Sequence, residues 1–521
     1  MMTALAHGSH AWRLGELLDG LVEPDAALSA VHDHQVGALA LDSRSLPPGA
    51  IFLACQGTAT HGLSFADEAQ RRGAIAILAE PSATWPREAI RGLQSRLGLP
   101  ILVADQLTAR LSRLADRFYD QPSAHLEVFG VTGATGKTSV THYLSQALAP
   151  EMVCGIIGTI GIGLPGELRP APAASDALGL QRILDDLRDR GARAVALEVP
   201  AGAMDGERMA AVRFTHALFT NHTPAWADRP NDTHDTGVEQ RLFAATGLGW
   251  AVLNLDDPFA ETILAGLPLG VAVAGYSLRS DVPAARRCDI WLRGVTVETR
   301  STGLRVWIDE VTGDAEELVD LEVGLIGTFN VTNLLAVLAV MCSRGVPLER
   351  AAREIAGVRG VSGRMECFGG DDAPLVVVDY ARTPDALEKA LVNLRRHGCR
   401  RIITVFGCRG EQDPALRPLM GEVAERLSDT LILTDDNPRF ESGDAIIADI
   451  LAGVADPRAV RIDRERALAV RLAIALAGIG DAVLVAGKGH ENTQDLGDQQ
   501  FHFSDRALVV EALREWREGR H

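Results

Sequence analysis

The chain contains 521 residues, of which 47% are hydrophobic and 23% are charged, and its formal net charge is −18. These fractions are typical of a folded globular protein and argue against widespread disorder. The acidic balance, without any basic stripe, argues against a nucleic-acid partner, because such binding draws its affinity from clustered Lys and Arg. From length alone we expect about three domains.

The N-terminal segment lacks the basic start and the apolar stretch of an export signal, and no run of about 18 apolar residues occurs anywhere. The seven cysteines are scattered, with neither metal-ligand spacing nor a disulfide framework. We therefore expect a cytoplasmic protein with reduced thiols and no membrane partner.

Two joints rich in Pro and Gly divide the chain, "FYDQPSAHLEV" around Pro122 and "IAGVRGVSGRMECF" around Gly363. They predict domains over residues 1–122, 123–360 and 361–521. In the second and third domains, short apolar runs alternate with amphipathic helical stretches such as "DALEKALVNLRRHG". This alternation predicts an α/β fold with parallel sheets covered on both faces, whose ligands bind at the carboxyl ends of the strands.

The first of these apolar runs, "LEVFGVT", leads into "GATGKTS" and then into a helical pattern. Glycines at such a turn let backbone N–H groups point at phosphate oxygens, and the following helix directs its positive end at them. In this arrangement Lys137 neutralises the β and γ phosphates of ATP and Thr138 binds Mg²⁺. The spacing departs from the standard Walker pattern, in which two more residues separate the glycines. The predicted ATP-binding loop comprises Gly133, Ala134, Thr135, Gly136, Lys137, Thr138 and Ser139.

Two later strand ends carry polar residues. "ALEVPAG" places Glu198 at a strand end, where it is either a solvated terminus or the carboxylate partner of Mg²⁺. "AVLNLDDP" places Asn254, Asp256 and Asp257 at another, where they serve the nucleotide or cap a helix; on this motif alone, the cap is favoured.

With these motifs and further ones in the same order, the chain resembles the Mur ligases of bacterial cell-wall synthesis, most closely the type that adds meso-diaminopimelate. The further motifs are "LALDSRSLPPGAIFLACQG", "GTFNVTN", "SGRMECF", "VVVDYARTPDAL", "TDDNPR" and "GKGHE". The resemblance implies a three-domain architecture, with a central P-loop domain that binds ATP and a C-terminal Rossmann-like domain that binds the amino acid. It also implies ATP and Mg²⁺ as cofactors, and a carboxylate that is activated as an acyl phosphate before an amine attacks it.

The same resemblance implies roles for individual residues. Lys137, Glu198 and Arg382 are assigned to catalysis, and Thr138 and Glu198 to the metal. Besides the loop, nucleotide contacts fall to Asn254, Asp257, Asn330 and Arg364, with Asn333 in the same motif as Asn330. The small-molecule substrates are assigned to Ser43, Arg44, Arg208, Asp436, Asn437, Pro438, Arg439, Gly487 and Glu491, where Ser43 and Arg44 match a uridine-binding segment, Arg439 grips a carboxylate and Glu491 is available to the distal amine.

Several positions depart from the family pattern in the central domain. "AASD" at 173–176 lacks the two hydroxyls of Thr-Thr-Pro-Asp, and 200–202 reads Pro-Ala-Gly in place of Ser-Ser-His. "AWADRPN" at 225–231 lacks the family histidines, and His216, His222 and His234 are expected at the surface. Gln240 occupies the position of the carbamylated Lys, and a carboxamide cannot be carbamylated, which weakens the predicted metal site.

The C-terminal domain departs as well. Arg382 replaces a family His, and Gln412 and Leu416 stand where basic residues are usual, while Arg417 is kept. Arg409 either replaces the lost carboxylate contact or lies on the surface.

Three interpretations stay open on these grounds. The first is an active ligase with the standard substrates. The second is a ligase for a different carboxylate in a secondary pathway. The third is a catalytically weak ATP-binding paralogue that acts as a protein partner or regulatory subunit.

Overall fold

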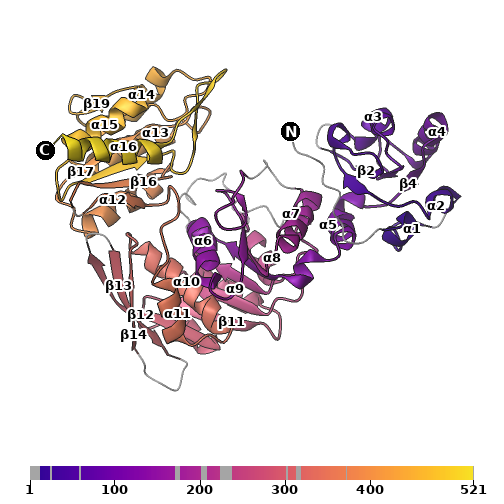
Figure 1. Cartoon of the computed structure of the whole chain (residues 1–521), viewed down its shortest axis with the longest axis horizontal. Coiled ribbons are helices and arrows are strands. Elements are labelled where there is room, and N and C mark those ends of the chain that lie inside the picture. Colours follow the sequence, from indigo (N-terminus) through magenta and orange to yellow (C-terminus); the bar gives the residue numbers. More distant parts are fainter. Residues whose placement is uncertain are drawn as a thin grey trace.

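The computed structural model describes residues 12–23, 26–57, 60–170, 176–200, 208–222, 237–300, 303–311, 318–370 and 372–519. It forms three lobes that follow one another along the chain, with the central lobe between the other two (Figure 1). Each lobe is built on its own sheet with helices packed against it, so the predicted α/β class is confirmed. Each sheet also lies within one of the three ranges expected from the sequence, and their boundaries stay a prediction.

The N-terminal lobe has a four-stranded parallel sheet in the order β1-β2-β3-β4. One apolar core joins the sheet to α1, α2 and α5, and a second joins it to α3 and α4. Its elements are α1 (Leu14–Leu17), α2 (Ala26–Val31), β1 (Ala38–Ala40), η1 (Ser43–Ser45), β2 (Ala50–Ala54), η2 (Gly62–Phe65), α3 (Ala66–Arg71), β3 (Ala76–Ala79), α4 (Arg87–Leu97), β4 (Ile101–Val103) and α5 (Leu107–Phe118), with η3 (Pro122–His125) leading to the next lobe.

The central lobe has a ten-stranded sheet in the order β14-β13-β12-β11-β10-β9-β5-β8-β6-β7. Helices α6, α10 and α11 share one apolar core with the sheet, and α7, α8 and α9 share the core on its other face. Its strands are β5 (Glu127–Thr132), β6 (Cys154–Ile157), β7 (Ile162–Gly163), β8 (Ala194–Glu198), β9 (His216–Phe219), β10 (Trp250–Asn254), β11 (Ala272–Ser277), β12 (Ile290–Arg300), β13 (Gly303–Glu310) and β14 (Leu318–Val323). Its helices are α6 (Lys137–Leu148), α7 (Ala177–Asp189), α8 (Gly237–Phe243), α9 (Phe259–Gly266), η5 (Pro283–Arg287), α10 (Phe329–Ser343) and α11 (Leu348–Ile355).

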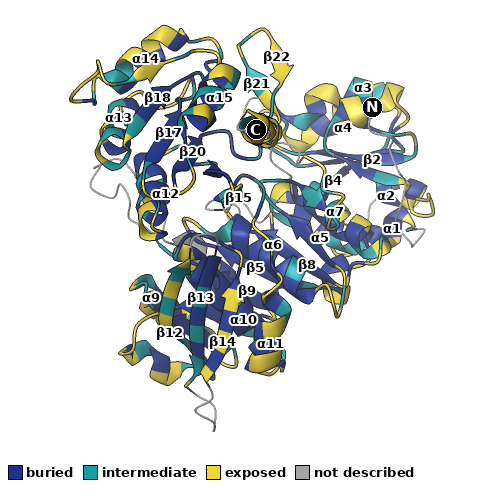
Figure 2. Cartoon of the chain, turned by 60° about the vertical axis from the view of Figure 1, so that its left-hand side comes forward, coloured by how far each residue is buried: buried dark blue, intermediate teal, exposed yellow. Residues whose placement is uncertain are grey.

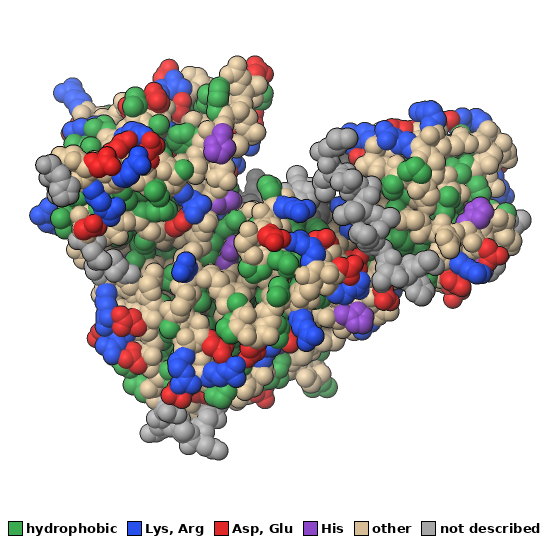
Figure 3. Space-filling model, in the orientation of Figure 1, with side chains coloured by type: hydrophobic (Ala, Val, Ile, Leu, Met, Phe, Trp, Pro, Cys, Tyr) green, Lys and Arg blue, Asp and Glu red, His purple; other side chains and the backbone are tan. Residues whose placement is uncertain are grey.

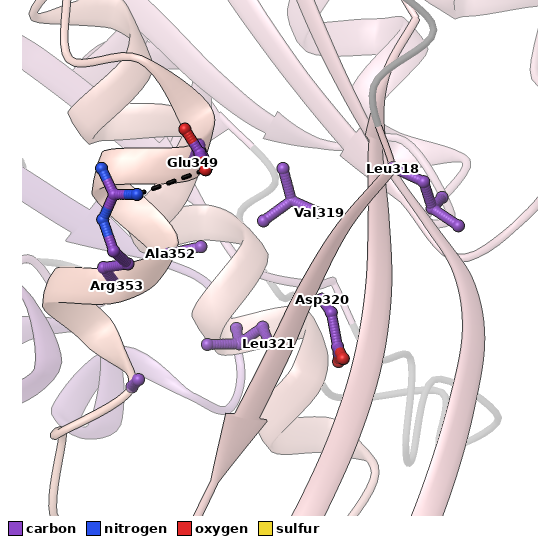
Figure 4. A pocket seen from close by; sticks show the side chains of 8 residues that line it. Leu318, Val319, Asp320, Leu321, Glu349, Ala352 and Arg353 are labelled. Carbon is purple, nitrogen blue, oxygen red and sulfur yellow. Dashed lines mark ion pairs between the residues drawn. The ribbon is translucent and has the colours of Figure 1, made fainter.

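The strands around β5 are parallel, as the apolar runs predict, but the sheet continues into an antiparallel extension of β12, β13 and β14. This extension is not among the strands expected from the sequence. Buried and exposed residues alternate along β14, because only one of its faces packs on the core. The cavity in Figure 4 lies beside this edge strand, between β14 and α11, and none of the predicted site residues lines it.

The C-terminal lobe has a six-stranded sheet, β15-β16-β20-β17-β18-β19, and a separate hairpin of β21 and β22. Helices α12, α13 and α14 pack on one face of the sheet and α15 and α16 on the other. Its elements are β15 (Glu366–Phe368), β16 (Leu375–Asp379), α12 (Pro384–Arg396), β17 (Ile402–Phe406), α13 (Leu416–Leu427), β18 (Thr430–Leu433), α14 (Gly443–Leu451), β19 (Arg461–Ile462), α15 (Arg466–Leu476), β20 (Ala482–Ala486), β21 (Thr493–Asp495), β22 (Gln500–His502) and α16 (Asp505–Glu518).

The central strands of the three sheets are buried and the outer helix surfaces are exposed (Figure 2). On the face shown in Figure 3, basic and acidic side chains are interspersed and do not gather into one stripe. Within the described parts of the chain, no helix is both long enough and apolar enough to cross a membrane.

Candidate active site

The predicted ATP-binding loop lies between the end of β5 and the start of α6. Gly133 and Gly136 have φ angles of 128° and 89°, which residues other than glycine rarely adopt. A Cβ at Gly133 would lie 2.3 Å from Thr220 Oγ1, and one at Gly136 would lie 2.6 Å from Asn333 Oδ1. Both positions therefore require glycine, and the loop has the close backbone packing expected of a phosphate cradle.

Two residues after β9 anchor this loop, and the sequence had not singled them out. Thr220 Oγ1 donates to the Thr135 carbonyl at 2.6 Å, and the Thr135 amide donates to Asn221 Oδ1 at 3.0 Å. The Ala134 amide donates to the Asn221 carbonyl at 2.8 Å. The sequence pattern that indicates Thr220 and Asn221 is their position directly after the apolar run "HALF", at the end of a predicted strand.

The ammonium group of Lys137 lies over the backbone of the predicted ATP-binding loop. Lys137 Nζ donates to the carbonyls of Gly133 and Ala134 at 2.5 and 3.3 Å. Thr138 and Ser139 are buried in the first turn of α6, so the amino end of this helix faces the glycines. A cation, inward backbone and a helix N-terminus together suit the phosphates of a nucleotide.

Glu198 ends β8, the strand beside β5, and pairs in register with Val131. Its carboxylate is buried and accepts hydrogen bonds from the Thr159 amide at 3.0 Å and the Thr159 hydroxyl at 2.8 Å. A Cβ at Gly158 would lie 2.3 Å from Glu198 Oε1, so any larger residue here would displace the carboxylate from its present position. Glu198 is therefore an oriented carboxylate at the loop end of the sheet, and Thr159 is a third residue that sequence reasoning missed, after Thr220 and Asn221.

The donor set near the loop is made of oxygens, which are the ligands that Mg²⁺ prefers. Thr138 and Glu198 supply a hydroxyl and a carboxylate from neighbouring elements. Among the described residues there is no group of three or more His, Cys, Asp or Glu that could hold a metal ion.

Asp257 and Asn254 have structural partners. Asp257 accepts hydrogen bonds from the Phe259 amide at 2.9 Å and the His222 amide at 2.6 Å, so it connects the start of α9 to the segment that follows β9. Asn254 donates to the Thr220 carbonyl at 2.7 Å and thereby supports the residue that anchors the loop. The N-cap position of α9 is Pro258, so Asp257 contacts the first helical amide without being the cap residue, and its role at the nucleotide stays a prediction.

Asn330 and Asn333 lie buried in the first turns of α10. Asn330 Oδ1 accepts hydrogen bonds from the Tyr143 hydroxyl at 3.1 Å and from Asn333 Nδ2 at 3.2 Å. Because Tyr143 belongs to α6, these contacts fix α10 against the helix that carries Lys137.

The C-terminal motifs converge at the carboxyl ends of β16, β18 and β20. Arg382 donates to the Gly487 carbonyl at 2.8 Å, and Lys488 donates to Asn437 Oδ1 at 2.8 Å. Asn437 Nδ2 donates to Glu491 Oε2 at 2.9 Å. Strand ends that are distant in sequence therefore form one polar site.

Arg439 lies at the rim of this site with a φ of 54°. It donates to Glu411 Oε2 at 2.9 Å, and its Nε lies 3.6 Å from Asp495 Oδ2. Pro438 directly precedes it and accepts a hydrogen bond from Glu441. The motif thus presents the guanidinium of Arg439 beside the hairpin of β21 and β22.

Arg364 and Arg382 both lie over the ring of Tyr380, at 4.5 and 3.9 Å from its centroid. Arg364 also reaches the central lobe electrostatically, since its charge helps to lower the pKa of His142 in α6. Burial is the larger cause of that lowered pKa, and Glu198 opposes it. The C-terminal site therefore lies near the loop end of the central sheet.

In the N-terminal lobe, Ser43 donates to Glu68 Oε2 at 2.8 Å. Arg44 is exposed and forms a two-pronged contact with Asp42, with Nη2 to Oδ2 at 2.8 Å. Arg208 lies on an exposed turn. None of these three contacts the loop or the C-terminal site among the described residues.

The structure shows how far His216, His222 and Arg409 are buried. The surface assignment of His216 is wrong: it is 5% exposed, its Nε2 lies 3.1 Å from Ser343 Oγ, and burial lowers its pKa to about 4. The pattern misled because β9 is a central strand buried on both faces. His222 is partly buried and stacks on Phe259. Arg409 is half-buried, with 20% of its side chain exposed, and its Nη2 lies 2.6 Å from Glu491 Oε1.

Some departures fall outside the described residues, namely 173–175, 201–202, 225–231 and His234. Gln240, at the position of the family Lys, is exposed on α8.

Comparison with known proteins gives matches over each lobe. Residues 35–119 match the Mur ligase family catalytic domain, 131–341 the Mur ligase middle domain and 363–489 the Mur ligase glutamate ligase domain.

Curated relatives match almost the whole chain. A UDP-N-acetylmuramoyl-L-alanyl-D-glutamate–2,6-diaminopimelate ligase of Alkalilimnicola ehrlichii is 43% identical over 95% of this chain and 98% of its own. One of Xanthomonas campestris is 41% identical over 97% of this chain and 98% of its own.

Solved structures agree. A ligase of the same name has a TM-score of 0.70 at 28% identity, with 98% of this chain and 100% of its own covered. MurF of Thermotoga maritima, in complex with ADP, has a TM-score of 0.60 at 18% identity, covers 93% of this chain and 98% of its own, and shares the fold. With its three lobes, its loop and its near full-length relatives taken together, this chain belongs to the Mur ligase family.

Proposed function

We propose that the protein is an ATP-dependent ligase that joins meso-diaminopimelate to UDP-N-acetylmuramoyl-L-alanyl-D-glutamate. The observation that carries this proposal is the glycine-dependent loop at β5, with Lys137 over it, in a chain 43% identical to a ligase of that name. These substrates and ATP belong to the cytoplasm, where we place the reaction.

The chemistry proceeds in two steps. The γ-phosphoryl group of ATP passes to an oxygen of the substrate carboxylate, which releases ADP and forms an acyl phosphate. The amine nitrogen then attacks the acyl carbon, loses a proton and expels inorganic phosphate, which leaves an amide bond. The chain contributes mainly by positioning the reactants and stabilising charge.

The proposed roles follow from the geometry. Lys137 and the amino end of α6 stabilise the negative charge that develops on the phosphates. Thr138 and Glu198 would bind Mg²⁺, which supplies further neutralisation of that charge. Thr159 holds the carboxylate of Glu198 in place through two hydrogen bonds.

The amino acid is proposed to bind at the carboxyl ends of β16, β18 and β20, where the Arg439 guanidinium would form an ion pair with one of its carboxylates. Asn437, Gly487 and Arg382 shape this site through the contacts described above. Asn330 serves the nucleotide indirectly through its contact with Tyr143 of α6, and Asp257 does so through the His222 amide, next to the Asn221 that anchors the loop.

One observation favours a second candidate, a catalytically weak paralogue that binds ATP as a regulatory subunit. Gln240 provides no anion at the position where the family carries its carbamylated Lys, so one metal contact is lost.

Release of inorganic phosphate from ATP separates the candidates. We expect turnover that requires both UDP-N-acetylmuramoyl-L-alanyl-D-glutamate and meso-diaminopimelate. Turnover with another acid in place of the nucleotide-linked dipeptide would favour a ligase of different specificity. Tight ATP binding, measured by calorimetry, without any phosphate release would favour the regulatory paralogue.

A second prediction concerns the N-terminal lobe. If Ser43 and Arg44 contact uridine, saturating UDP should raise the midpoint of thermal unfolding, because a ligand that binds only the folded state stabilises it. The matched control is Arg44→Ala, which should abolish the shift, and ADP should leave hydrogen exchange in residues 38–57 unchanged. Equal shifts for the variant and the parent protein would argue against a role of Arg44.

A further inference from the structure

The carboxyl end of α12 connects the C-terminal lobe to the central lobe. α12 lies on the side of its lobe that faces β13 (Figure 1), and its C-cap residue, His397, is buried there. His397 Nε2 accepts a hydrogen bond from the Gly327 amide at 2.9 Å, and Nδ1 lies 2.6 Å from the Arg300 carbonyl. Because a carbonyl can only accept, Nδ1 carries the proton, and one neutral imidazole satisfies both backbone groups. Burial lowers the pKa of His397, which favours this neutral form, although the bond to Arg300 opposes the shift.

Asn393, one turn earlier in α12, makes a second contact of the same kind. Its Oδ1 accepts hydrogen bonds from the Thr328 amide at 2.9 Å and the Thr328 hydroxyl at 3.2 Å. Its Nδ2 donates to the Lys389 carbonyl at 2.7 Å, so the orientation of the amide is fixed within its own helix. We call these contacts of Asn393 and His397 with Gly327 and Thr328 the lobe junction. Both side chains are buried, so water does not readily replace their hydrogen bonds.

The central-lobe side of the lobe junction is the start of α10, which also packs on the ATP-binding loop. Gly327 and Thr328 directly precede this helix. Asn330 and Asn333 lie in its first two turns, where Asn330 bonds to Tyr143 of α6 and Asn333 lies against Gly136. The start of α10 therefore has a fixed position relative to the loop, and the lobe junction attaches the C-terminal lobe to that fixed point.

The other end of α12 lies at the polar site of the C-terminal lobe. The helix begins at Pro384 with Thr383 as its N-cap, and Arg382, which donates to the Gly487 carbonyl, directly precedes the cap. At about 1.5 Å per residue, its 13 residues span roughly 20 Å. A single helix thus joins this site to the lobe junction, and a tilt of α12 at its carboxyl end would move the site.

The segment that links the two lobes is attached to the second helix beside the loop. Gln146 of α6 donates to the Arg359 carbonyl at 3.1 Å and accepts from the Arg359 amide at 2.9 Å. α6 is the helix that begins with Lys137. The C-terminal lobe is therefore attached to both helices that pack beside the ATP-binding loop, through an exposed contact on α6 and a buried one on α10.

We propose that Asn393 and His397 are positioning residues of the ligase, which hold the C-terminal lobe on the start of α10 and so place the bound amino acid relative to the ATP-binding loop. This inference rests on the proposed function. The attacking nitrogen and the acyl carbon must approach to about 3 to 3.5 Å, and a misplacement of about 1 Å can cost a hundredfold in rate. Each substrate keeps its own contacts when the lobe shifts, so the loss falls on the chemical step.

Kinetics of His397→Phe test this role, because the variant keeps a buried ring and loses both ring nitrogens. We expect kcat to fall roughly 10- to 100-fold, with KM for ATP and for meso-diaminopimelate within about threefold of the parent values. Asn393→Leu should behave in the same way. His397→Gln, which retains one donor and one acceptor, should recover part of the loss. Expressing kcat per ADP-binding site, counted by calorimetry, removes any contribution from unfolded protein.

The matched control is Arg395→Gln in the last turn of the same helix. Arg395 pairs with Asp429 inside the C-terminal lobe and does not belong to the lobe junction, so this variant should keep the parent kcat. An unchanged kcat in both His397→Phe and Asn393→Leu would overturn the proposal. A raised KM with an unchanged kcat would also overturn it, because the two residues would then support a binding site rather than the placement of one site against another.

Hydrogen exchange and small-angle scattering test the lobe junction without turnover. The amides of Gly327 and Thr328 donate to His397 and Asn393, so exchange in residues 324–332 should be faster in His397→Phe, and the radius of gyration should rise. If the parent protein shows no ligase turnover but both changes occur, the proposed function fails and the attachment of the lobe stands. If the parent protein is active and both changes occur without a loss of kcat, the ligase function stands and the positioning role fails. Unchanged exchange and scattering would overturn the lobe junction itself.

Discussion

Replacement of Lys137 by alanine is expected to lower ligase turnover by roughly a thousandfold or more. The ammonium lies over the loop carbonyls of Gly133 and Ala134, within reach of any phosphate that the glycine turn holds. No other lysine belongs to this loop, so the positive charge that stabilises the transferred phosphoryl group would be lost. Phosphate release at saturating substrates measures the effect.

The matched control is Lys389→Ala, which removes an exposed lysine paired with Asp385 on α12. It should leave turnover unchanged. Circular dichroism of the Lys137 variant should match that of the parent protein, which separates lost chemistry from lost fold. Turnover near the parent level in the Lys137→Ala variant would show that the loop does not handle the transferred phosphate.

The parallel sheets and the loop could be predicted because their signals are local. Apolar runs followed by polar residues indicate parallel strands and their carboxyl ends. Gly133 and Gly136 indicate a turn whose positive φ angles are rare for residues with a side chain. The identity of Glu198 as a strand-end carboxylate beside the loop followed from the same rule.

The anchors of the loop could not be predicted in this way. Asn221 contacts Thr135 across 86 residues of sequence, and Thr159 contacts Glu198 across 39. The first contact depends on β5 lying beside β9 and the second on β6 lying beside β8, and no local pattern encodes this order of strands. The antiparallel strands β12 to β14 were not predicted, because buried and exposed residues alternate in them and they lack the continuous apolar runs that indicate parallel strands.

The polar cluster around Glu491 shows the same limit in the C-terminal lobe. Arg382, Arg409 and Glu491 come from three separate loops, and each appears in the sequence as a single departure or a single motif residue. Only the fold reveals that both arginines meet one carboxylate. Interpretation of each substitution by itself therefore underestimated how strongly the site is charged.

Replacement of Asp505 by asparagine is expected to destabilise the C-terminal lobe by about 3 to 5 kcal/mol, because it leaves a buried guanidinium without its counter-ion. Arg466 and Asp505 are both fully buried and pair at 2.8 Å. Arg466 also donates to the Ala486 carbonyl at 2.9 Å, directly before Gly487 and Lys488. The pair thus links the stability of α15 and α16 to the loop that carries Glu491.

Hydrogen exchange of peptides from β16, β17 and β20 measures this destabilisation in the affected lobe, where a whole-chain unfolding curve would mix three domains. The matched control is Asp444→Asn, which breaks an exposed pair with Arg464 and should cost less than about 1 kcal/mol. Since Arg466 supports the backbone ahead of Lys488, the Asp505→Asn variant should also bind meso-diaminopimelate more weakly while its affinity for ADP is preserved. Equal exchange in the two variants would mean that the buried pair contributes no more than the exposed one, and that the loop owes its position to the strand β20 alone.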